Sequence, residues 1–466
     1  PKAKIRPKQL SRGVDQMFPN ERGLLMYLST TAALFLSIAS LASAQQLPPP
    51  LDDDAFLPVD LQQVKLGQLL FYDPILSGNR ETACATCHHP NLGTSDGVSL
   101  SLGDGGMGLG PDRRADPNNL PEDRIPRNSP GLFNLGAKEF TVLFHDGRLE
   151  ADPARPGGIR TPMDADMVSG FASVLAAQTM FPVLSRDEMA GSYAENDIAR
   201  LVRQGRITGT GGAWDLLARR VADLPEYSVE FAALYPHIAT PDDIAFTDIA
   251  NVIAAFVSYE WRSDTAPFDE VLRGTRALKE QQEAGLEIFY GPGRCATCHA
   301  GPFLTDHQFH AMATPQIGPG KAAIFEDHQR DEGRFRVTGR AEDRFAFRTP
   351  SLRNIALTAP YGHAGAHADL SRFIADHANP KESLGRYDRE QAILPEFSAS
   401  DFAVLDDPQQ VQEIIAAVQA EPVTLSPDNI AALVAFLETL TDPISLTGRL
   451  GIPKSVPSGL PVPTLN

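Results

Sequence analysis

The pattern of apolar and polar positions along the chain is mostly helical. From Leu61 to Tyr72 apolar residues recur at helical spacing, and the run ends at Asp73-Pro74, which is typical of a helix boundary. Clear apolar helices are also expected from Asp248 to Tyr259 and from Leu278 to Tyr290. The pattern further predicts helices over Val168–Met180, Asp197–Arg203, Trp214–Val221, Leu370–His377, Val411–Val418 and Asn429–Leu440. Because strand signals are few, we expect a mainly α fold.

Two of these helices lead into the same short motif. Cys84-Ala85-Thr86-Cys87-His88 follows the first helix, and Cys295-Ala296-Thr297-Cys298-His299 follows the helix that ends at Tyr290. C-x-x-C-H is the attachment site of a c-type haem, in which two thiols form thioethers with the porphyrin and the histidine ligates the iron. A zinc site or a thioredoxin-like pair would not need the trailing histidine twice. The two copies use all four cysteines, so we expect two covalent c-type haems, bound by Cys84, Cys87, His88, Cys295, Cys298 and His299.

The repeated order of helix, turn and C-x-x-C-H indicates an internal duplication. We therefore expect two cytochrome-c-like domains, and Pro267 and Gly274 favour a boundary that gives residues 45–270 and 271–466. A Gly-rich stretch from Gly93 to Gly110 follows the first motif, and irregular polar sequence continues to Arg127. Long loops in compact domains are usually functional or disordered, and this position favours a loop that covers the first haem.

The composition limits the classes of protein to which this chain can belong. The 466 residues include 42% hydrophobic residues, enough for sizeable cores. With 41 basic and 59 acidic residues, the formal net charge is −18. An acidic chain of this kind is unlike a nucleic-acid-binding protein, so no nucleic-acid partner is expected.

Residues 1–44 have the pattern of a signal peptide. Basic residues come first, an apolar run extends from Leu24 to Leu41, and Ala42-Ser43-Ala44 fits a cleavage site before Gln45. A permanent membrane anchor is the alternative, but the run is about as short as a spanning helix can be and serine and threonine dilute it. We expect cleavage, export to the periplasm and no stable membrane span after processing.

The motifs between and around the haem sites resemble those of the bacterial di-haem cytochrome c peroxidase family, and within it the MauG-like branch. The similarity covers about residues 56 to 445. It is carried, in this order, by Cys84–His88, Arg127-Asn128-Ser129-Pro130, Phe144-His145-Asp146-Gly147-Arg148, Phe181-Pro182 to Glu188-Met189, Cys295–His299, Arg348-Thr349-Pro350-Ser351-Leu352-Arg353-Asn354 and Pro360-Tyr361-Gly362-His363. The resemblance implies that the N-terminal haem reacts with hydrogen peroxide and that the C-terminal haem relays electrons.

At the first haem, the resemblance implies an open iron. His88 is the proximal ligand, and in the classical peroxidases a histidine on the following loop caps the other face until the enzyme is reduced. This chain has no histidine between His89 and His145, so we expect an iron ready for peroxide, as in MauG-like members. Glu188 matches the family's distal glutamate, which moves a proton during peroxide cleavage, and Gln178 matches a distal glutamine.

At the second haem, His299 is the expected proximal ligand. The family's sixth ligand lies a fixed distance after Pro360-Tyr361, and His377 occupies that position. Methionine stands there in classical peroxidases and tyrosine in MauG, and Tyr387 is the competing ligand in this chain. Ligation by two histidines would give a low-spin haem with a potential below that of a His/Met haem.

Two further inferences depend on the resemblance. The family holds a calcium ion between the haems through a side-chain amide and two backbone carbonyls, and the matching residues are Asn128, Thr358 and Pro360. The family usually has tryptophan between the haems, where this chain has His145. Histidine is harder to oxidise than tryptophan, so the sharing of oxidising equivalents between the haems is in doubt.

Three functions are consistent with these observations. The first is a periplasmic peroxidase that receives electrons from a small cytochrome c or a cupredoxin. The second is a MauG-like enzyme that uses peroxide to oxidise residues of a partner protein, which the missing tryptophan disfavours. The third is a non-catalytic electron carrier, which requires both irons to be six-coordinate.

Overall fold

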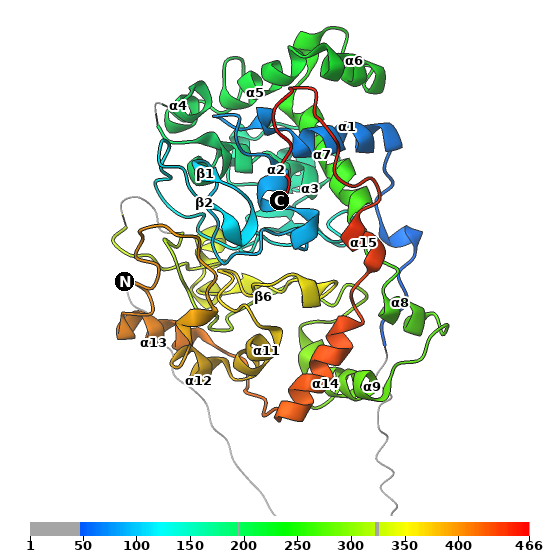
Figure 1. Cartoon of the computed structure of the whole chain (residues 1–466), viewed down its shortest axis with the longest axis vertical. Coiled ribbons are helices and arrows are strands. Elements are labelled where there is room, and N and C mark those ends of the chain that lie inside the picture. The colour runs from blue at the N-terminus through cyan, green and yellow to red at the C-terminus, as the bar shows by residue number, and fades with distance from the viewer. Residues whose placement is uncertain (1–46, 194, 322–325, 466) are drawn as a thin grey trace, which may run out of the picture. The chain divides into compact units, whose positions relative to one another are not determined.

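Figure 1 shows a fold made mainly of helices that are joined by long irregular segments. The described residues also form three small antiparallel sheets. The computed structural model describes residues 47–193, 195–321 and 326–465. The helices are α1 (Leu61–Tyr72), α2 (Cys84–Cys87), α3 (Val174–Thr179), α4 (Asp197–Arg203), α5 (Ala213–Ala222), α6 (Pro225–Leu234), α7 (Phe246–Glu260), α8 (Pro267–Leu272), α9 (Glu280–Tyr290), α10 (Phe335–Thr338), α11 (Leu370–Ala378), α12 (Pro380–Leu384), α13 (Pro408–Ala417), α14 (Pro427–Glu438) and α15 (Pro443–Thr447). The prediction of a mainly α fold is confirmed.

The strands are two or three residues long. They are β1 (Gly106–Met107), β2 (Arg114–Ala115), β3 (Val142–Leu143), β4 (Leu149–Ala151), β5 (Ile159–Arg160), β6 (Phe309–His310) and β7 (Phe347–Arg348). β1 pairs with β2, β4 pairs with both β3 and β5, and β6 pairs with β7. The last pair joins the segment after the second haem motif to the segment before Pro350, with Phe309 opposite Arg348.

Most predicted helices form close to the expected residues. α1 has the predicted bounds, because Asp60 caps its first turn and Asp73 ends it before Pro74. The helix predicted over Val168–Met180 begins only at Val174, since the Ser173 side chain accepts a hydrogen bond from the Ala176 N–H and caps the helix there. α6, which the sequence pattern did not predict, begins with Pro225 and buries Tyr227 and Phe231, one turn apart.

Two helix pairs repeat the same close packing. In the α1–α7 pair, a Cβ added to Gly67 would lie 1.9 Å from the Val252 carbonyl oxygen. In the α9–α14 pair, a Cβ added to Gly285 would lie 2.0 Å from the Ala432 carbonyl oxygen. Glycine therefore lets the two backbones touch at each crossing. Figure 1 shows the first pair near the top and the second near the lower right.

Aromatic residues repeat around both crossings. Phe71 packs against Phe256 with ring centroids 5.3 Å apart, and Phe289 packs against Phe436 at 5.2 Å. Both α1 and α9 end in Phe-Tyr, four and five residues after the glycine of the crossing. This residue-level repeat agrees with the expected duplication. The described residues nevertheless form one compact unit, and the division into domains at residues 270 and 271 stays a prediction.

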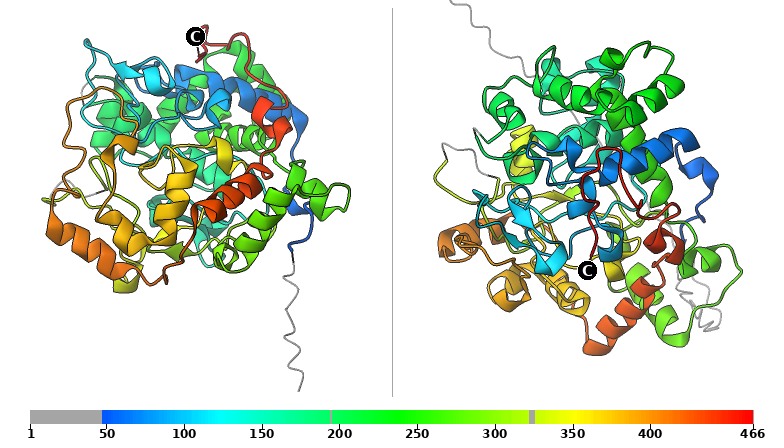
Figure 2. Two further views of the ribbon diagram at one scale, coloured as in Figure 1. Left: turned by 60° about the horizontal axis from the view of Figure 1, so that its bottom comes forward. Right: turned by 45° about the horizontal axis from the view of Figure 1, so that its top comes forward.

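The chain after α15 returns to the N-terminal helices. Residues 448–465 are irregular, yet Val456 is buried in the same hydrophobic cluster as residues of α1 and α7. Figures 1 and 2 show this red segment crossing the helices and ending beside the blue N-terminal part of the fold. The tail, expected to belong to the C-terminal domain, thus packs on the N-terminal helices.

No helix in the described part of the chain is long and apolar enough to cross a membrane. The predicted signal peptide, residues 1–44, and its cleavage site lie outside the described residues.

Candidate active site

The first C-x-x-C-H motif presents a histidine ring oriented by its surroundings. Cys84 to Cys87 form α2, and the His88 Nδ1 lies 3.0 Å from the Thr94 carbonyl oxygen and 3.2 Å from the Ser129 Oγ. Ser129 also donates to the Cys87 carbonyl at 2.6 Å. With Nδ1 held in this way, Nε2 is the nitrogen available to a metal, as is usual for metal-ligating histidines. Burial lowers the pKa of His88, which favours the neutral imidazole that an iron requires.

The second motif repeats this arrangement. Its cysteines lie at a short 3-10 turn (Cys295–Thr297), and the His299 Nδ1 lies 3.1 Å from the Leu304 carbonyl oxygen. A second imidazole faces this one, because the His299 and His377 ring centroids are 6.5 Å apart. Two metal–nitrogen bonds of about 2 Å account for about 4 Å of such a separation, and the two ring radii account for the rest. At this separation, His299 and His377 would both be able to ligate one iron.

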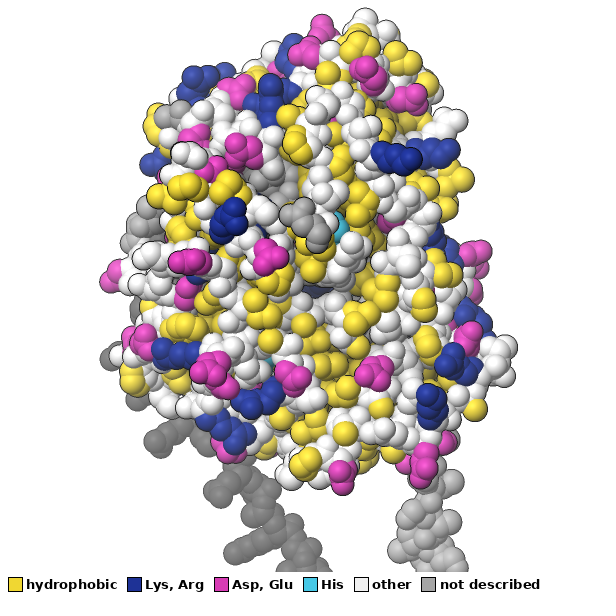
Figure 3. Space-filling model, in the orientation of Figure 1, with side chains coloured by type: hydrophobic (Ala, Val, Ile, Leu, Met, Phe, Trp, Pro, Cys, Tyr) yellow, Lys and Arg dark blue, Asp and Glu magenta, His cyan; other side chains and the backbone are white. Residues whose placement is uncertain are grey.

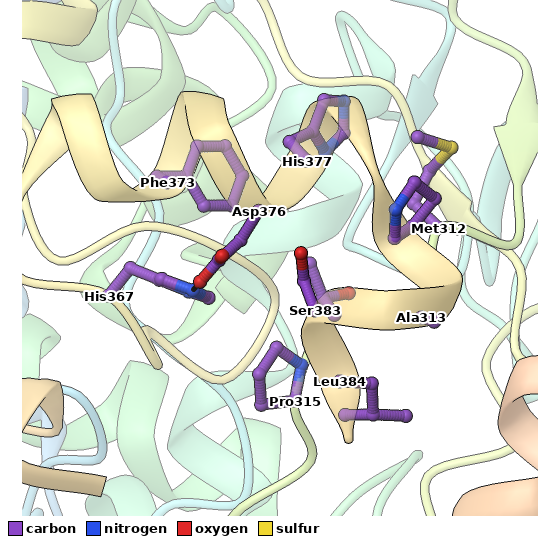
Figure 4. A pocket seen from close by; sticks show the side chains of 11 residues that line it. Met312, Ala313, Pro315, His367, Phe373, Asp376, His377, Ser383 and Leu384 are labelled. Carbon is purple, nitrogen blue, oxygen red and sulfur yellow. Dashed lines mark hydrogen bonds and ion pairs between the residues drawn. The ribbon is translucent and has the colours of Figure 1, made fainter. Parts of the chain in front are cut away.

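The surroundings of His377 favour it over Tyr387 as the residue that would ligate the second iron together with His299. Burial lowers the pKa of His377 to about 4, with a further contribution from His299, so its ring is neutral. Phe373 stacks on it from one helical turn earlier, with ring centroids 5.2 Å apart (Figure 4). The Tyr387 hydroxyl instead donates to the Ala366 carbonyl.

Figure 4 also shows two further side chains near His377, those of His367 and Met312. His367 turns to Asp376, with its Nε2 3.0 Å from the Asp376 Oδ2. Met312 lines the same small pocket. Its thioether belongs to a segment with no recognisable motif, and only the fold brings it near the second haem site.

Gln178 and Glu188 lie on neighbouring segments of the N-terminal half. Gln178 is near the end of α3, and its Oε1 is buried without a hydrogen-bond partner among the described residues. Glu188 is half-buried on a single π-helical turn, Arg186–Ala190, a local geometry that is frequent at functional sites. Its carboxylate acts electrostatically on Cys87, where burial is the main cause of a pKa of about 12 for the free thiol. Glu188 therefore lies within electrostatic range of the first motif.

The Gly-rich loop after the first motif packs against the Glu188 turn. A Cβ added to Gly103 would lie 2.2 Å from the Asp187 carbonyl oxygen and 2.6 Å from that of Glu188. Only glycine permits this approach. The observation agrees with the expectation that residues 93–110 cover the first haem site.

A buried ion-pair network connects residues that are far apart in the sequence. Arg127 makes a two-pronged contact with Asp331, at 2.6 and 2.9 Å, and a further ion pair with Asp146 at 2.7 Å. Nearby, the His145 Nε2 lies 3.1 Å from the Asn128 carbonyl oxygen. Burial and the Arg127 charge lower the pKa of His145 to about 3, so the histidine that replaces the family's tryptophan is neutral.

Two cations lie near these sites, and neither forms an ion pair with a carboxylate of the described residues. Burial lowers the pKa of Arg348 to about 10, and its guanidinium donates only to the carbonyls of Phe144 and Thr349, at 3.3 and 3.2 Å. Burial also lowers the pKa of Lys321, on which the charges of Arg148, Arg127 and Glu188 act. Half-buried cations without a carboxylate partner are suited to bind an anion. The carboxylates of a haem fit that need, so the residues present suit the cofactor that the motifs predict.

Asn128, Thr358 and Pro360 lie on segments that run close together. The Asn128 amide nitrogen donates to the Val98 and Ser99 carbonyls, at 2.9 and 3.3 Å, which directs Oδ1 the opposite way. The Asn128 N–H donates to the His363 carbonyl at 2.9 Å. Thr358, two residues before Pro360, packs close to Gly93 of the Gly-rich loop. Calcium binding by these residues stays a prediction.

Comparison with known proteins identifies the family. The family model described as di-haem cytochrome c peroxidase matches residues 61–277. The chain belongs to the di-haem cytochrome c peroxidase family. The cytochrome c551 peroxidase of Pseudomonas aeruginosa is 29% identical over 359 residues, which cover 76% of this chain and 84% of that protein. The MauG of Paracoccus denitrificans is 28% identical over 438 residues, 90% of this chain and 96% of that protein.

Solved structures agree with this family assignment. A MauG-like protein associated with microbial copper homeostasis has 27% sequence identity and a TM-score of 0.53, over 86% of this chain and 95% of that chain. The di-haem peroxidase BthA from Burkholderia thailandensis shares the fold, with a TM-score of 0.58. These relatives confirm the predicted family with its MauG-like branch, the two haems and the assignment as a peroxide-dependent oxidoreductase.

Proposed function

We propose that this di-haem peroxidase reduces hydrogen peroxide at the site of the N-terminal haem with electrons that enter through the C-terminal haem. The observation that carries the proposal is the asymmetry of the two sites. The His299 ring faces His377 at 6.5 Å, whereas positions 90–144 after the first motif contain no histidine. The described segments near the first motif carry no such histidine. They carry the Glu188 carboxylate and the Gln178 amide.

When bound, the haems supply an iron for peroxide and an iron for electron transfer. His88 and His299 would ligate the two irons, and His377 would be the sixth ligand of the second. Glu188 moves a proton from one peroxide oxygen to the other, so that the second oxygen leaves as water. Gln178 orients the bound peroxide through its free Oε1. With two electrons and two protons from outside, one peroxide becomes two waters.

The electron donor is proposed to be a small cytochrome c or a cupredoxin. Charged side chains of both signs are scattered over the face in Figure 3, without a broad patch of one sign. Turnover tests this reading: the reduced donor should be oxidised in proportion to added peroxide, two one-electron donors for each peroxide. Peroxide consumption without donor oxidation would contradict it. We assign the mature protein to the periplasm, on the basis of the residue 1–44 pattern.

A MauG-like reaction on a partner protein is the second candidate. It is favoured by the absence of a capping histidine after the first motif and by the 28% identity to a MauG over 90% of this chain. The neutral His145 between the sites disfavours it. Peroxide-dependent modification of a partner protein, with no oxidation of small redox proteins, would replace the first candidate by this one. An electron carrier would leave peroxide untouched.

The proposed calcium ion gives a separate prediction. Purified protein should contain about one calcium per chain, held by the Asn128 side chain and the Thr358 and Pro360 carbonyls. Chelation should slow peroxide reduction and alter the spectrum of the first haem, because these ligands join the segments around both sites. Calcium should restore both properties, whereas magnesium, which prefers a smaller octahedral site, should not. Full activity after complete removal of calcium would contradict the prediction.

A further inference from the structure

The C-terminal tail, residues 448–465, is attached to the N-terminal helices by buried carboxylates. Glu260, at the end of α7, is 1% exposed, and its two oxygens accept the N–H groups of Leu450 and Gly451, each at 2.7 Å. The Arg449 guanidinium donates to the carbonyls of Tyr259 and Glu260 at the end of α7, at 3.1 and 3.3 Å, and to the Arg262 carbonyl just after the helix, at 2.8 Å. The start of the tail therefore caps α7.

A second carboxylate binds the tail further along. Asp73, which ends α1 and is fully buried, accepts a hydrogen bond from the Ser458 Oγ at 2.6 Å and another from the Tyr227 hydroxyl at 2.7 Å. Between the two anchors, Val456 is 5% exposed and packs in the N-terminal hydrophobic cluster. Release of the tail would leave two buried carboxylates short of donors, which is costly. The tail is therefore a fixed part of the fold.

The end of the tail reaches the residue next to the proximal ligand. The Pro463 backbone lies beside the ring of His89, which is fully buried. The His89 Nδ1 accepts a hydrogen bond from the Asn91 N–H, so the remaining ring hydrogen lies on Nε2, and the Pro463 carbonyl is the backbone acceptor beside this ring. The end of the tail is therefore a direct neighbour of the His89 ring.

His89 is in turn linked to the support of His88. The His89 N–H donates to the Ser95 carbonyl at 3.0 Å, and the Thr94 N–H donates back to the His89 carbonyl at 3.0 Å. These bonds fix the position of the Thr94 carbonyl, which lies 3.0 Å from the His88 Nδ1. A shift of the His89 ring would move the acceptor that orients the proximal imidazole, and such indirect contacts tune a bound metal.

We propose that the C-terminal tail is a positioning element for the proximal ligand of the first haem, acting through His89 and the Thr94 carbonyl on His88. The proposal rests on His88 being the iron ligand of the proposed peroxide site. It assigns a role at the N-terminal site to a segment that the chain contributes from its far end. α15, immediately before the tail, packs against Pro90–Leu92 and supports the same turn.

Two variants of the full-length holoprotein test this role. Val456→Asp puts a charge into the hydrophobic cluster and should detach the tail, whereas Ser455→Asp adds the same charge at the exposed neighbouring position. In Val456→Asp, proteolytic cleavage within residues 448–465 should become at least tenfold faster. The iron–histidine stretching band of the reduced first haem should shift, while the low-spin signal of the second haem stays unchanged. Ser455→Asp should match the unaltered protein in all three measurements.

Ser458→Ala is a milder variant for the case in which Val456→Asp does not accumulate. It removes one donor from Asp73 and should move the stretching band in the same direction by a smaller amount. Faster cleavage of the tail with an unshifted band would overturn the proposal, as would a shift of equal size in Ser455→Asp. Because the band is recorded without peroxide, a failure of the proposed peroxide chemistry would leave this result interpretable.

Discussion

Replacing Glu188 by glutamine should slow the reaction with peroxide by about a hundred- to ten-thousand-fold while both haems stay attached, because a positioned general acid–base group contributes about that much. Glutamine preserves the size of the side chain but cannot take a proton from one peroxide oxygen and return it to the other. The substituted side chain should keep the position of Glu188 on the π-helical turn next to Gly103. Stopped-flow absorbance after mixing with peroxide measures the rate.

Asp187→Asn is the matched control, because it removes a carboxylate from the same turn. Asp187 forms an ion pair with Arg186 at 3.0 Å, so its loss should affect a salt bridge rather than the proton transfer. We expect the peroxide rate to fall less than tenfold in this variant. If the two substitutions slow the reaction equally, Glu188 has no special role and the turn as a whole matters.

Replacing His377 by alanine should convert the second haem from low-spin to high-spin almost completely. The side chain faces His299 across the space that an iron would occupy, and its removal leaves one axial position without that imidazole. Loss of this ligand should also slow electron delivery to the first site. Absorption and EPR spectra of the oxidised protein check the spin state, and donor-dependent turnover checks the relay.

Tyr387→Phe distinguishes the two candidate ligands. The Tyr387 hydroxyl donates to the Ala366 carbonyl, so its removal should cost a local hydrogen bond and leave both haem spectra unchanged. A second haem that responds to Tyr387→Phe and ignores His377→Ala would reverse the assignment. A low-spin haem that persists in His377→Ala would point to another ligand, and Met312 in the same pocket is the first to examine.

The parts of this structure that were predictable from sequence depend on local patterns. α1 forms over the predicted residues because apolar spacing and the capping residues Asp60 and Asp73 agree. The C-x-x-C-H motifs were equally recognisable, since haem attachment requires adjacent residues at fixed spacing. The pairing of His299 with His377 was predicted only through the family resemblance. The two residues lie 78 positions apart, and no local sequence pattern indicates that they meet.

Features that depend on distant segments were not predictable in this way. Arg127 and Asp331 lie 204 residues apart, and nothing in either local sequence indicates that they form a buried pair. The tail is irregular and rich in proline and glycine, so no helical or alternating pattern indicates that Val456 is buried or that Ser458 binds Asp73. Both features arise from packing between segments that only the folded chain brings together.

Low-temperature EPR of the oxidised protein, recorded before and after addition of hydrogen peroxide, shows directly whether the first iron is open to peroxide. We expect one high-spin signal from the first haem and one low-spin signal typical of two histidine ligands from the second. Peroxide should abolish the high-spin signal. Two low-spin signals that do not respond to peroxide would contradict the account, because the first iron would then carry a sixth ligand and could not bind peroxide without prior activation.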